Sequence, residues 1–259
     1  MAIPILAPTF TSLEQLAPAL QNQGYAVLCD RDLAALSGAS LAELHHLNPS
    51  WDNLPPDAFL KDGGRYRSRR HASFIIHAPA IELVAHRAHY QPLAYNALHG
   101  GMHRLFEAIE AHTLAQAAWN KLLLALTGVC SALKGAQPWY VEAHQFRIDT
   151  RHGIGRPTPE GAHRDGVDFV AIVLVNRVHV SGGESRVFEA EGRNGQRFTL
   201  TEPWTLVLLD DHKVIHESTP IQPLADDAHR DTLVLTFRAG GFLQPLTDAA
   251  ITPSTFAQA

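Results

Sequence analysis

The sequence predicts a mainly β protein of the sandwich or barrel type, with helices concentrated in its first half. From residue 139 onward, short runs rich in β-branched and aromatic residues alternate with glycine, proline and aspartate turns. Before residue 135, apolar residues instead recur every three to four positions, most clearly over 102–133. The fold class is therefore α+β or mainly β, with the helices packed outside the sheets. The expected strands of the second half are residues 141–148, 169–180, 184–189, 198–200, 205–209, 214–217 and 232–237.

The first half is expected to supply helices and a few short strands. Capping residues and apolar spacing predict helices over 12–20, 30–47 and 102–133, with a short strand at 24–29. Paired prolines and glycines make 51–64 a loop, which leads into a basic stretch and a strand ending near residue 76. No polar linker separates the halves. We expect one domain over 1–259, with 1–135 a mostly helical flank and 136–245 the core that carries the functional site.

Composition excludes several classes of protein. The net charge is -5 with 21 Lys+Arg, which gives no electrostatic reason to expect a nucleic-acid partner. No apolar run approaches the roughly 20 residues that span a bilayer, and the N-terminus lacks the basic segment of a signal peptide. Cys29 and Cys130 are too few for a disulfide framework. We therefore expect a cytoplasmic protein; nothing in the sequence indicates its oligomeric state.

The segment around His163-Arg-Asp165 is the most informative part of the sequence. In an extended segment His163 and Asp165 project to the same side, because side chains alternate along a strand. Gly161 and Gly166 flank the pair and allow a sharp bend. His216, in a later strand, is placed to add a third ligand. Two histidines and one carboxylate form the facial triad that holds non-haem Fe(II) and leaves other coordination positions open.

Arg230 stands at the entry to the last predicted strand, with Thr232 two residues on and hence on the same face. A 2-oxo acid chelates iron through its keto oxygen and adjacent carboxylate, which leaves a distant carboxylate to be held elsewhere. A guanidinium group offers a planar fork that pairs with such a carboxylate through two hydrogen bonds. The alternative for Arg230 is a surface ion pair with a neighbouring aspartate.

These residues, in this order, resemble the Fe(II)/2-oxoglutarate-dependent dioxygenases. The string Pro159-Glu-Gly-Ala-His-Arg-Asp-Gly-Val-Asp168 is similar to that of the bacterial isoleucine dioxygenase branch, whose members hydroxylate free aliphatic L-amino acids. The resemblance implies a double-stranded β-helix (jelly-roll) core, Fe(II), O2 and 2-oxoglutarate, with succinate and CO2 as co-products. It assigns the metal to His163, Asp165 and His216, and 2-oxoglutarate to Arg230 and Thr232. A retained Asp165 favours hydroxylation over halogenation, because related halogenases lack this carboxylate.

A free amino acid needs an anion for its ammonium group and a cation for its carboxylate. Glu160 and Asp168 flank the proposed metal ligands and are candidates for the ammonium group. Arg147 and Arg156 are candidates for the carboxylate, and Arg147 would face the interior if its neighbour Phe146 packs outward. The basic stretch adds two further candidates at the mouth of the site, Arg67 and Arg70. An aliphatic residue such as Ile, Leu or Met is favoured; the carbon oxidised, and the balance between hydroxylation and sulfoxidation, stay open.

Two other functions fit part of the pattern. A cupin-type metal enzyme that does not use 2-oxoglutarate would leave Arg230 without a required role. A non-catalytic metal-binding module would close the site with a fourth ligand, such as His179 or His212. Seven of the 16 histidines lie in helical-looking segments and complete no set with a carboxylate, namely His45, His46, His86, His89, His99, His103 and His112.

Overall fold

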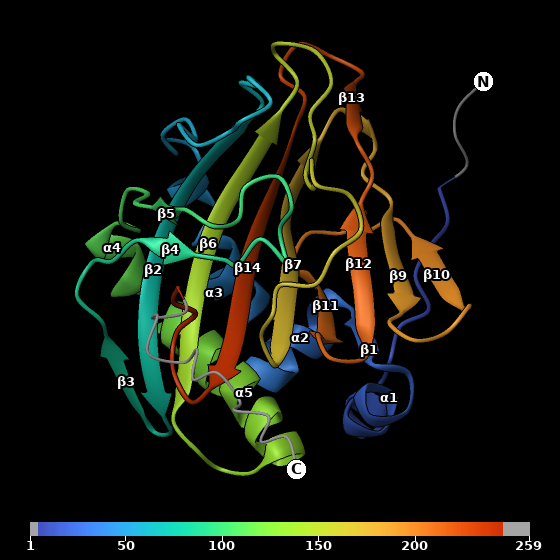
Figure 1. Cartoon of the computed structure of the whole chain (residues 1–259). Helices are drawn as coiled ribbons and strands as arrows, with labels where there is room; N and C mark the ends of the chain where they lie inside the picture. Colours follow the sequence, from blue (N-terminus) through green and yellow to red (C-terminus); the bar gives the residue numbers. More distant parts are fainter. Residues whose placement is uncertain (1–4, 246–259) are drawn as a thin grey trace, which may run out of the picture.

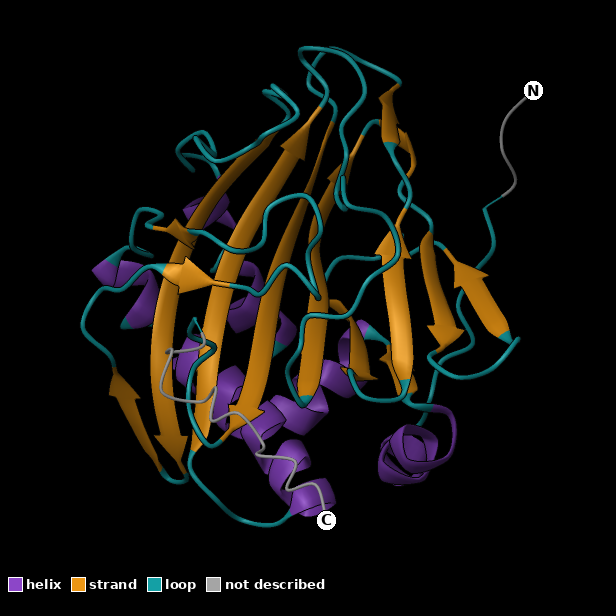
Figure 2. Cartoon of the chain, in the orientation of Figure 1, coloured by secondary structure: helices purple, strands orange, loops and turns teal. Residues whose placement is uncertain are grey.

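The protein is described here from a computed structural model that covers residues 5–245. Its two sheet layers and the helices behind them are drawn in Figures 1 and 2. The helices are η1 (Leu13–Gln15), α1 (Leu16–Gln23), α2 (Asp30–Ser37), α3 (Leu41–His45), η2 (Asn48–Trp51), α4 (Ala111–Leu114) and α5 (Ala117–Lys134). The strands of the first half are β1 (Tyr25–Leu28), β2 (Arg67–His77), β3 (Ala80–Leu83), β4 (His89–Tyr90) and β5 (His103–Arg104). The later strands are β6 (Trp139–Asp149), β7 (Phe169–Val178), β8 (Val180–Gly182), β9 (Ser185–Glu189), β10 (Gly195–Phe198), β11 (Thr205–Asp210), β12 (Val214–Ser218), β13 (Ile221–Pro223) and β14 (His229–Ala239).

The major sheet has seven strands in the order β1-β11-β7-β14-β6-β2-β3. A second layer consists of the three-stranded sheet β10-β9-β12 and the pair β13-β8. The ladders of the major sheet are antiparallel, and most neighbours are far apart in sequence, as in a jelly roll. This arrangement confirms the predicted mainly β, double-stranded β-helix fold with flanking helices.

Each long strand of the major sheet has one face toward the helices and one toward the second layer, because side chains alternate along a strand. On β14, Leu233, Leu235 and Phe237 join the apolar core beneath the helices. The alternate residues Arg230, Thr232, Val234 and Thr236 line a cavity between the sheet layers. In Figures 1 and 2, α2 and α5 lie behind the major sheet. The cavity lies on the other face of this sheet.

The helical predictions for the first half were too long. The predicted 30–47 helix is two helices, because Gly38 ends α2 in the left-handed region (φ 67°) and Ser40 begins α3 with a capping box to Glu43. Within the predicted 102–133 helix, only α4 (Ala111–Leu114) and α5 (Ala117–Lys134) are helical. Residues before α4 pair with β2 instead: the His71 amide donates to the Glu107 carbonyl at 2.9 Å.

The first half also contributes more to the sheet than a helical flank would. β1 is one edge strand of the major sheet and β2 lies inside it, between β6 and β3. The boundary expected at residue 135 therefore does not separate helices from sheet. The expected single domain over 1–259 stays a prediction, and its two ends lie outside the described residues. Within 5–245, none of the helices is long and apolar enough to cross a membrane.

Candidate active site

Two histidines and an aspartate converge at one wall of the cavity. His216 is on β12, and a two-way backbone bridge to the loop residue His163 holds the two segments together (N–O 2.9 and 3.0 Å). Asp165 reaches both rings: its carboxylate oxygens lie 3.7 Å from His163 Nε2 and 3.6 Å from His216 Nε2. Two atoms bound to one metal at about 2.1 Å cannot lie more than about 4.2 Å apart. These separations fit a shared metal ion, and the three residues form one potential ligand group.

The hydrogen bonds and negative charges around His163 favour the binding of a metal cation. Its Nδ1 lies 2.9 Å from the Gly161 carbonyl, an acceptor, so Nδ1 carries a proton and Nε2, which faces Asp165, is the atom available to a metal. Burial disfavours a charged imidazole, but Asp165 and Glu160 outweigh burial and raise the pKa of His163 to about 9. The same negative field favours a metal dication. Burial and the nearby His163 lower the pKa of His216 to about 4, so His216 stays neutral and able to ligate.

The loop that carries Asp165 is held by a second aspartate. The Asp211 carboxylate accepts hydrogen bonds from three successive amides, those of Asp165, Gly166 and Val167 (2.7–3.1 Å). Gly166 has φ 79°, and a Cβ there would lie 2.4 Å from the Tyr95 ring, so no other residue fits without a shift. These contacts fix the direction of the Asp165 carboxylate.

Arg230 and Thr232 lie in the same cavity as the three potential ligands. Arg230 is only 4% exposed, yet its side chain has no hydrogen bond or ion pair within residues 5–245. Burial, with Arg177 nearby, lowers the pKa of Arg230 to about 10, still well above neutrality. A buried cation without a counter-ion is unfavourable, and a carboxylate would supply the missing partner. The guanidinium group therefore suits the distal carboxylate of 2-oxoglutarate.

Glu160 is the one predicted ammonium partner that lies in the cavity. Its Oε1 is 3.6 Å from His163 Nε2 and accepts from Asn96 Nδ2 at 3.5 Å. Its Oε2 is buried and has no partner among the described residues. Part of the cavity wall is apolar and consists of Val167, Ile172, Val187, Val207, Leu209 and Val234.

Of the other five candidates, only Arg67 lines the cavity, and Arg70 pairs with Glu107 and Glu110 instead. Asp168 bonds to Lys134 Nζ at 2.5 Å and to the Ala239 amide at 2.8 Å. Arg156 is exposed and borders a separate surface hollow. Arg147 projects to the helix side of β6 and pairs with Asp231 at 2.7 Å.

The expected orientation of β6 was wrong. Phe146 lines the cavity, while Gln145 and Arg147 lie on the opposite face, where Gln145 donates to Ser50 Oγ at 2.7 Å. Polar residues occupy both faces of this strand, so alternation alone could not show which face is internal.

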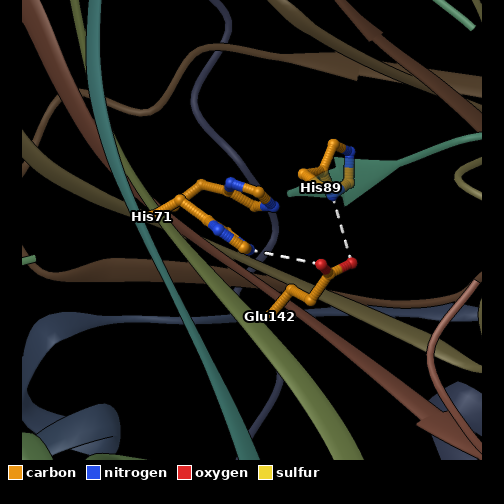
Figure 3. A group of neighbouring side chains, drawn as sticks. His71, His89 and Glu142 are labelled. Carbon is orange, nitrogen blue, oxygen red and sulfur yellow. Dashed lines mark hydrogen bonds and ion pairs between the residues drawn. The ribbon is translucent and has the colours of Figure 1, made fainter. Parts of the chain in front are cut away.

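A second polar cluster occupies the cavity wall beside β2, β4 and β6, and Figure 3 shows its core. His71 Nε2 and His89 Nδ1 donate to the two oxygens of Glu142, at 3.2 and 3.1 Å. Arg87 completes the shell of Glu142 at 2.9 Å. Together with His144 this cluster has metal-ligand composition. Most of its potential ligand atoms are already paired with protein groups, since His144 Nδ1 also accepts from Arg69 at 2.7 Å; His71 Nδ1 has no partner within residues 5–245.

This cluster corrects the sequence interpretation of His89. His89 is on strand β4, not on a helix, and it forms a set with a carboxylate and two further histidines. Sequence spacing could not find the set, because its members come from three separate strands. The prediction also missed Gln91, which donates to Asp165 Oδ1 at 3.0 Å, and Arg104, which lines the cavity.

The proposed fourth ligands of a closed metal module lie elsewhere. His179 is exposed and bonds to Asp227 at 2.6 Å. His212 is also exposed and lies 3.4 Å from Asp168. Neither belongs to the ligand group of the cavity, so within the described residues the site keeps three protein ligands.

A jelly roll with an open two-histidine, one-carboxylate site defines the class of non-haem iron oxygenases. The 2OG-Fe dioxygenase family matches residues 48–236 of the protein. The structure is also similar to a bsmA homologue from Methylobium petroleophilum PM1, with 50% identity, 93% of this protein and 98% of the other covered, and a TM-score of 0.87. The protein belongs to the 2OG-Fe dioxygenase family.

More distant solved structures share the fold. IDO from Bacillus thuringiensis has 19% identity over 90% of this protein and 100% of its own length, with a TM-score of 0.73. The Fe(II)/α-ketoglutarate-dependent dioxygenase TqaL has 17% identity over 87% of this protein and 86% of its own length, with a TM-score of 0.64. Comparison with curated proteins gives no match. The protein is therefore a dioxygenase that uses Fe(II), 2-oxoglutarate and O2 and acts on a small molecule, which sets aside the cupin-type alternative without 2-oxoglutarate.

Proposed function

We propose that the protein hydroxylates a free L-amino acid at a C–H bond of the amino acid's side chain. An aliphatic amino acid such as Ile, Leu or Met is favoured. The observation that carries this proposal is the buried Oε2 of Glu160, which lies beside the metal-ligand group and has no partner within residues 5–245. A buried carboxylate oxygen without a donor is unfavourable, and an ammonium group supplies donors. The apolar part of the cavity wall suits an aliphatic group.

The remaining roles follow from chemistry and placement. His163, Asp165 and His216 would hold Fe(II), and Arg230 with Thr232 would hold the distal carboxylate of 2-oxoglutarate. The bound iron and co-substrate supply the oxidising chemistry, with release of succinate and CO2. The protein orients the substrate: Glu160 fixes the ammonium group, the apolar wall fixes the aliphatic group, and Gln91 holds the Asp165 carboxylate.

The test is a screen of the proteinogenic L-amino acids for stimulated succinate formation, followed by mass analysis of the product. A substrate should gain one oxygen atom, and its position by NMR separates hydroxylation from sulfoxidation. Glu160→Gln should raise KM for the amino acid by about 30-fold or more, because an ammonium–carboxylate pair becomes a neutral contact. Its KM for 2-oxoglutarate should stay unchanged. Absence of stimulation by every amino acid would contradict the proposed substrate class.

The co-substrate has its own test. Under anaerobic conditions, Fe(II) with 2-oxoglutarate should give the visible charge-transfer band of a bidentate complex. If metal binds and the band is missing, the assignment of 2-oxoglutarate to this site is wrong.

Asp168→Asn serves as a matched control for Glu160→Gln, since Asp168 is close in sequence but lies outside the cavity.

A further inference from the structure

Three buried arginines gather at the end of the cavity formed by β2 and β5. Arg67 and Arg69 are alternate residues of β2 and project to the same side as Arg230 and Thr232 of β14, through Ile148 and Phe146 of β6. Arg104 comes from β5, which pairs with β4 (Figure 1). Arg67, Arg69 and Arg104 are 6, 4 and 3% exposed, so all three guanidinium groups are removed from bulk water.

One carboxylate, that of Asp57, pairs with two of the three arginines, Arg67 and Arg69. Asp57 Oδ2 lies 2.7 Å from Arg67 Nε and 3.7 Å from Arg69 NH1. Arg104 has no ion pair and no side-chain hydrogen bond among residues 5–245. Each arginine also has one buried nitrogen without a partner, namely Arg67 NH2, Arg69 Nε and Arg104 Nε. The end of the cavity therefore holds more positive than negative charge, and its donors exceed its acceptors.

The other acidic groups nearby are engaged elsewhere. Both carboxylate oxygens of Glu142 are paired, with His71, His89 and Arg87, and Figure 3 shows the contacts with the two histidines. Asp165 belongs to the metal-ligand group. Glu160 acts on the charge of Arg104 only at a distance, since no ion pair joins them. None of these carboxylates neutralises Arg104.

Aromatic rings fix the guanidinium planes but do not replace an anion. Arg69 lies between two rings, 3.6 Å from the Phe106 centroid and 4.4 Å from the Phe146 centroid. Arg104 lies 5.7 Å from the Phe106 centroid. Stacking of this kind leaves the N–H groups at the edge free to donate. Arg104 is therefore a preformed fork of donors with no acceptor among residues 5–245, as is Arg230.

We infer that this end of the cavity is a second anion site, in which Arg104, with Arg67 and Arg69, binds a carboxylate or similar oxyanion of the primary substrate. Naming the anion-bearing molecule as the substrate rests on the proposed function; the anion site itself does not. For an amino acid, the carboxylate would bind at Arg104 and the ammonium group at Glu160. This assignment replaces Arg147 and Arg156, which lie outside the cavity.

The first test measures stability and needs no substrate. Mn(II) and N-oxalylglycine fill the metal and 2-oxoglutarate sites, in chloride-free buffer, and thermal unfolding is followed with and without sodium acetate. Arg104→Met should unfold about 3 °C or more above wild type without acetate, because an unpaired buried cation is removed. Acetate should raise the Tm of wild type and leave that of Arg104→Met unchanged.

Arg104→Lys is the matched variant, since it keeps the charge but loses the planar fork. It should keep the lower Tm of wild type and gain less from acetate. A Tm of Arg104→Met at or below wild type would overturn the inference. So would an equal response to acetate in wild type and either variant.

The second test separates the anion site from the proposed function. For an amino acid that stimulates succinate formation, its C-terminal amide keeps the ammonium group and loses the anion. Wild-type kcat/KM for the amide should be at least about 30-fold lower, and Arg104→Met should lose this discrimination. Equal use of acid and amide by wild type would refute the anion site. If no amino acid supports turnover, the proposed substrate is wrong, and the acetate measurement still decides the anion site.

Discussion

Replacing Arg230 by methionine should raise the stability of the protein and lower its affinity for 2-oxoglutarate. The arginine is buried and unpaired within residues 5–245, so its charge should destabilise the protein when no co-substrate is bound. The same arginine should be the main partner of 2-oxoglutarate. The Arg230→Met variant is therefore expected to be more stable alone and much weaker in binding 2-oxoglutarate.

The magnitude of the stability effect comes from the pKa of Arg230. Burial and Arg177 lower this pKa from 12.5 to about 10 in the folded protein. The difference is equivalent to about 3 kcal/mol, carried by the folded state at every pH below about 10. Because neighbouring groups relax, we expect Arg230→Met to raise the free energy of unfolding by about 1–3 kcal/mol near neutral pH.

The binding effect should be larger. Removing one partner of a buried, charge-assisted pair costs about 2–5 kcal/mol, or about 30- to 5,000-fold in affinity. Urea unfolding gives the stability, and titration of the anaerobic Fe(II) protein, followed by its charge-transfer band, gives the 2-oxoglutarate affinity. In Arg230→Met the free energy of unfolding should rise and the affinity for 2-oxoglutarate should fall.

Arg238→Met is the control, because Arg238 is on the same strand but outside the cavity, where it donates to the Gly241 carbonyl. It should leave 2-oxoglutarate affinity unchanged. The reasoning is refuted if Arg230→Met binds 2-oxoglutarate as wild type does, or if Arg238→Met loses the co-substrate instead.

Three further changes test the metal loop and the histidine cluster. Asp165→Ala should lose succinate formation with an unchanged circular dichroism spectrum; an active variant would contradict the triad. Gly166→Ala should weaken Fe(II) binding and lower the free energy of unfolding by about 1–3 kcal/mol, because φ is 79° and a Cβ would meet Tyr95; unchanged iron affinity would contradict this. Burial lowers the pKa of His71 from 6.5 to about 4, so only the unfolded protein takes up this proton as pH falls. Stability should therefore decline by up to about 3 kcal/mol between about pH 6.5 and pH 4, and urea unfolding of His71→Gln should show a flatter profile.

Much of the β architecture was predictable because it depends on local periodicity. Most strands of the second half appear where alternation and turn residues placed them, with ends shifted by a few residues. The predicted strand 198–200 is an exception, since it overlaps β10 only at Phe198, and β13 was not predicted. The helices of the first half were predicted less well. Gly38 and the pairing of residues 107–109 with β2 break helical patterns, and that pairing depends on a strand more than 30 residues away.

The sequence by itself determined that Arg230 and Thr232 share a face, because both lie on strand β14 and side chains alternate along a strand. It also indicated that His163 and Asp165 act together, although the segment that carries them is a loop and not the expected extended strand. It could not determine which face of a strand is internal when both faces carry polar groups, so Phe146 and Arg147 were assigned to the wrong sides. Only the tertiary structure brought Arg67, Arg69 and Arg104 to one end of the cavity and showed that Arg104 has no partner within residues 5–245. Whether a charge has a counter-ion depends on contacts between distant segments, and these form only when the sheets pack.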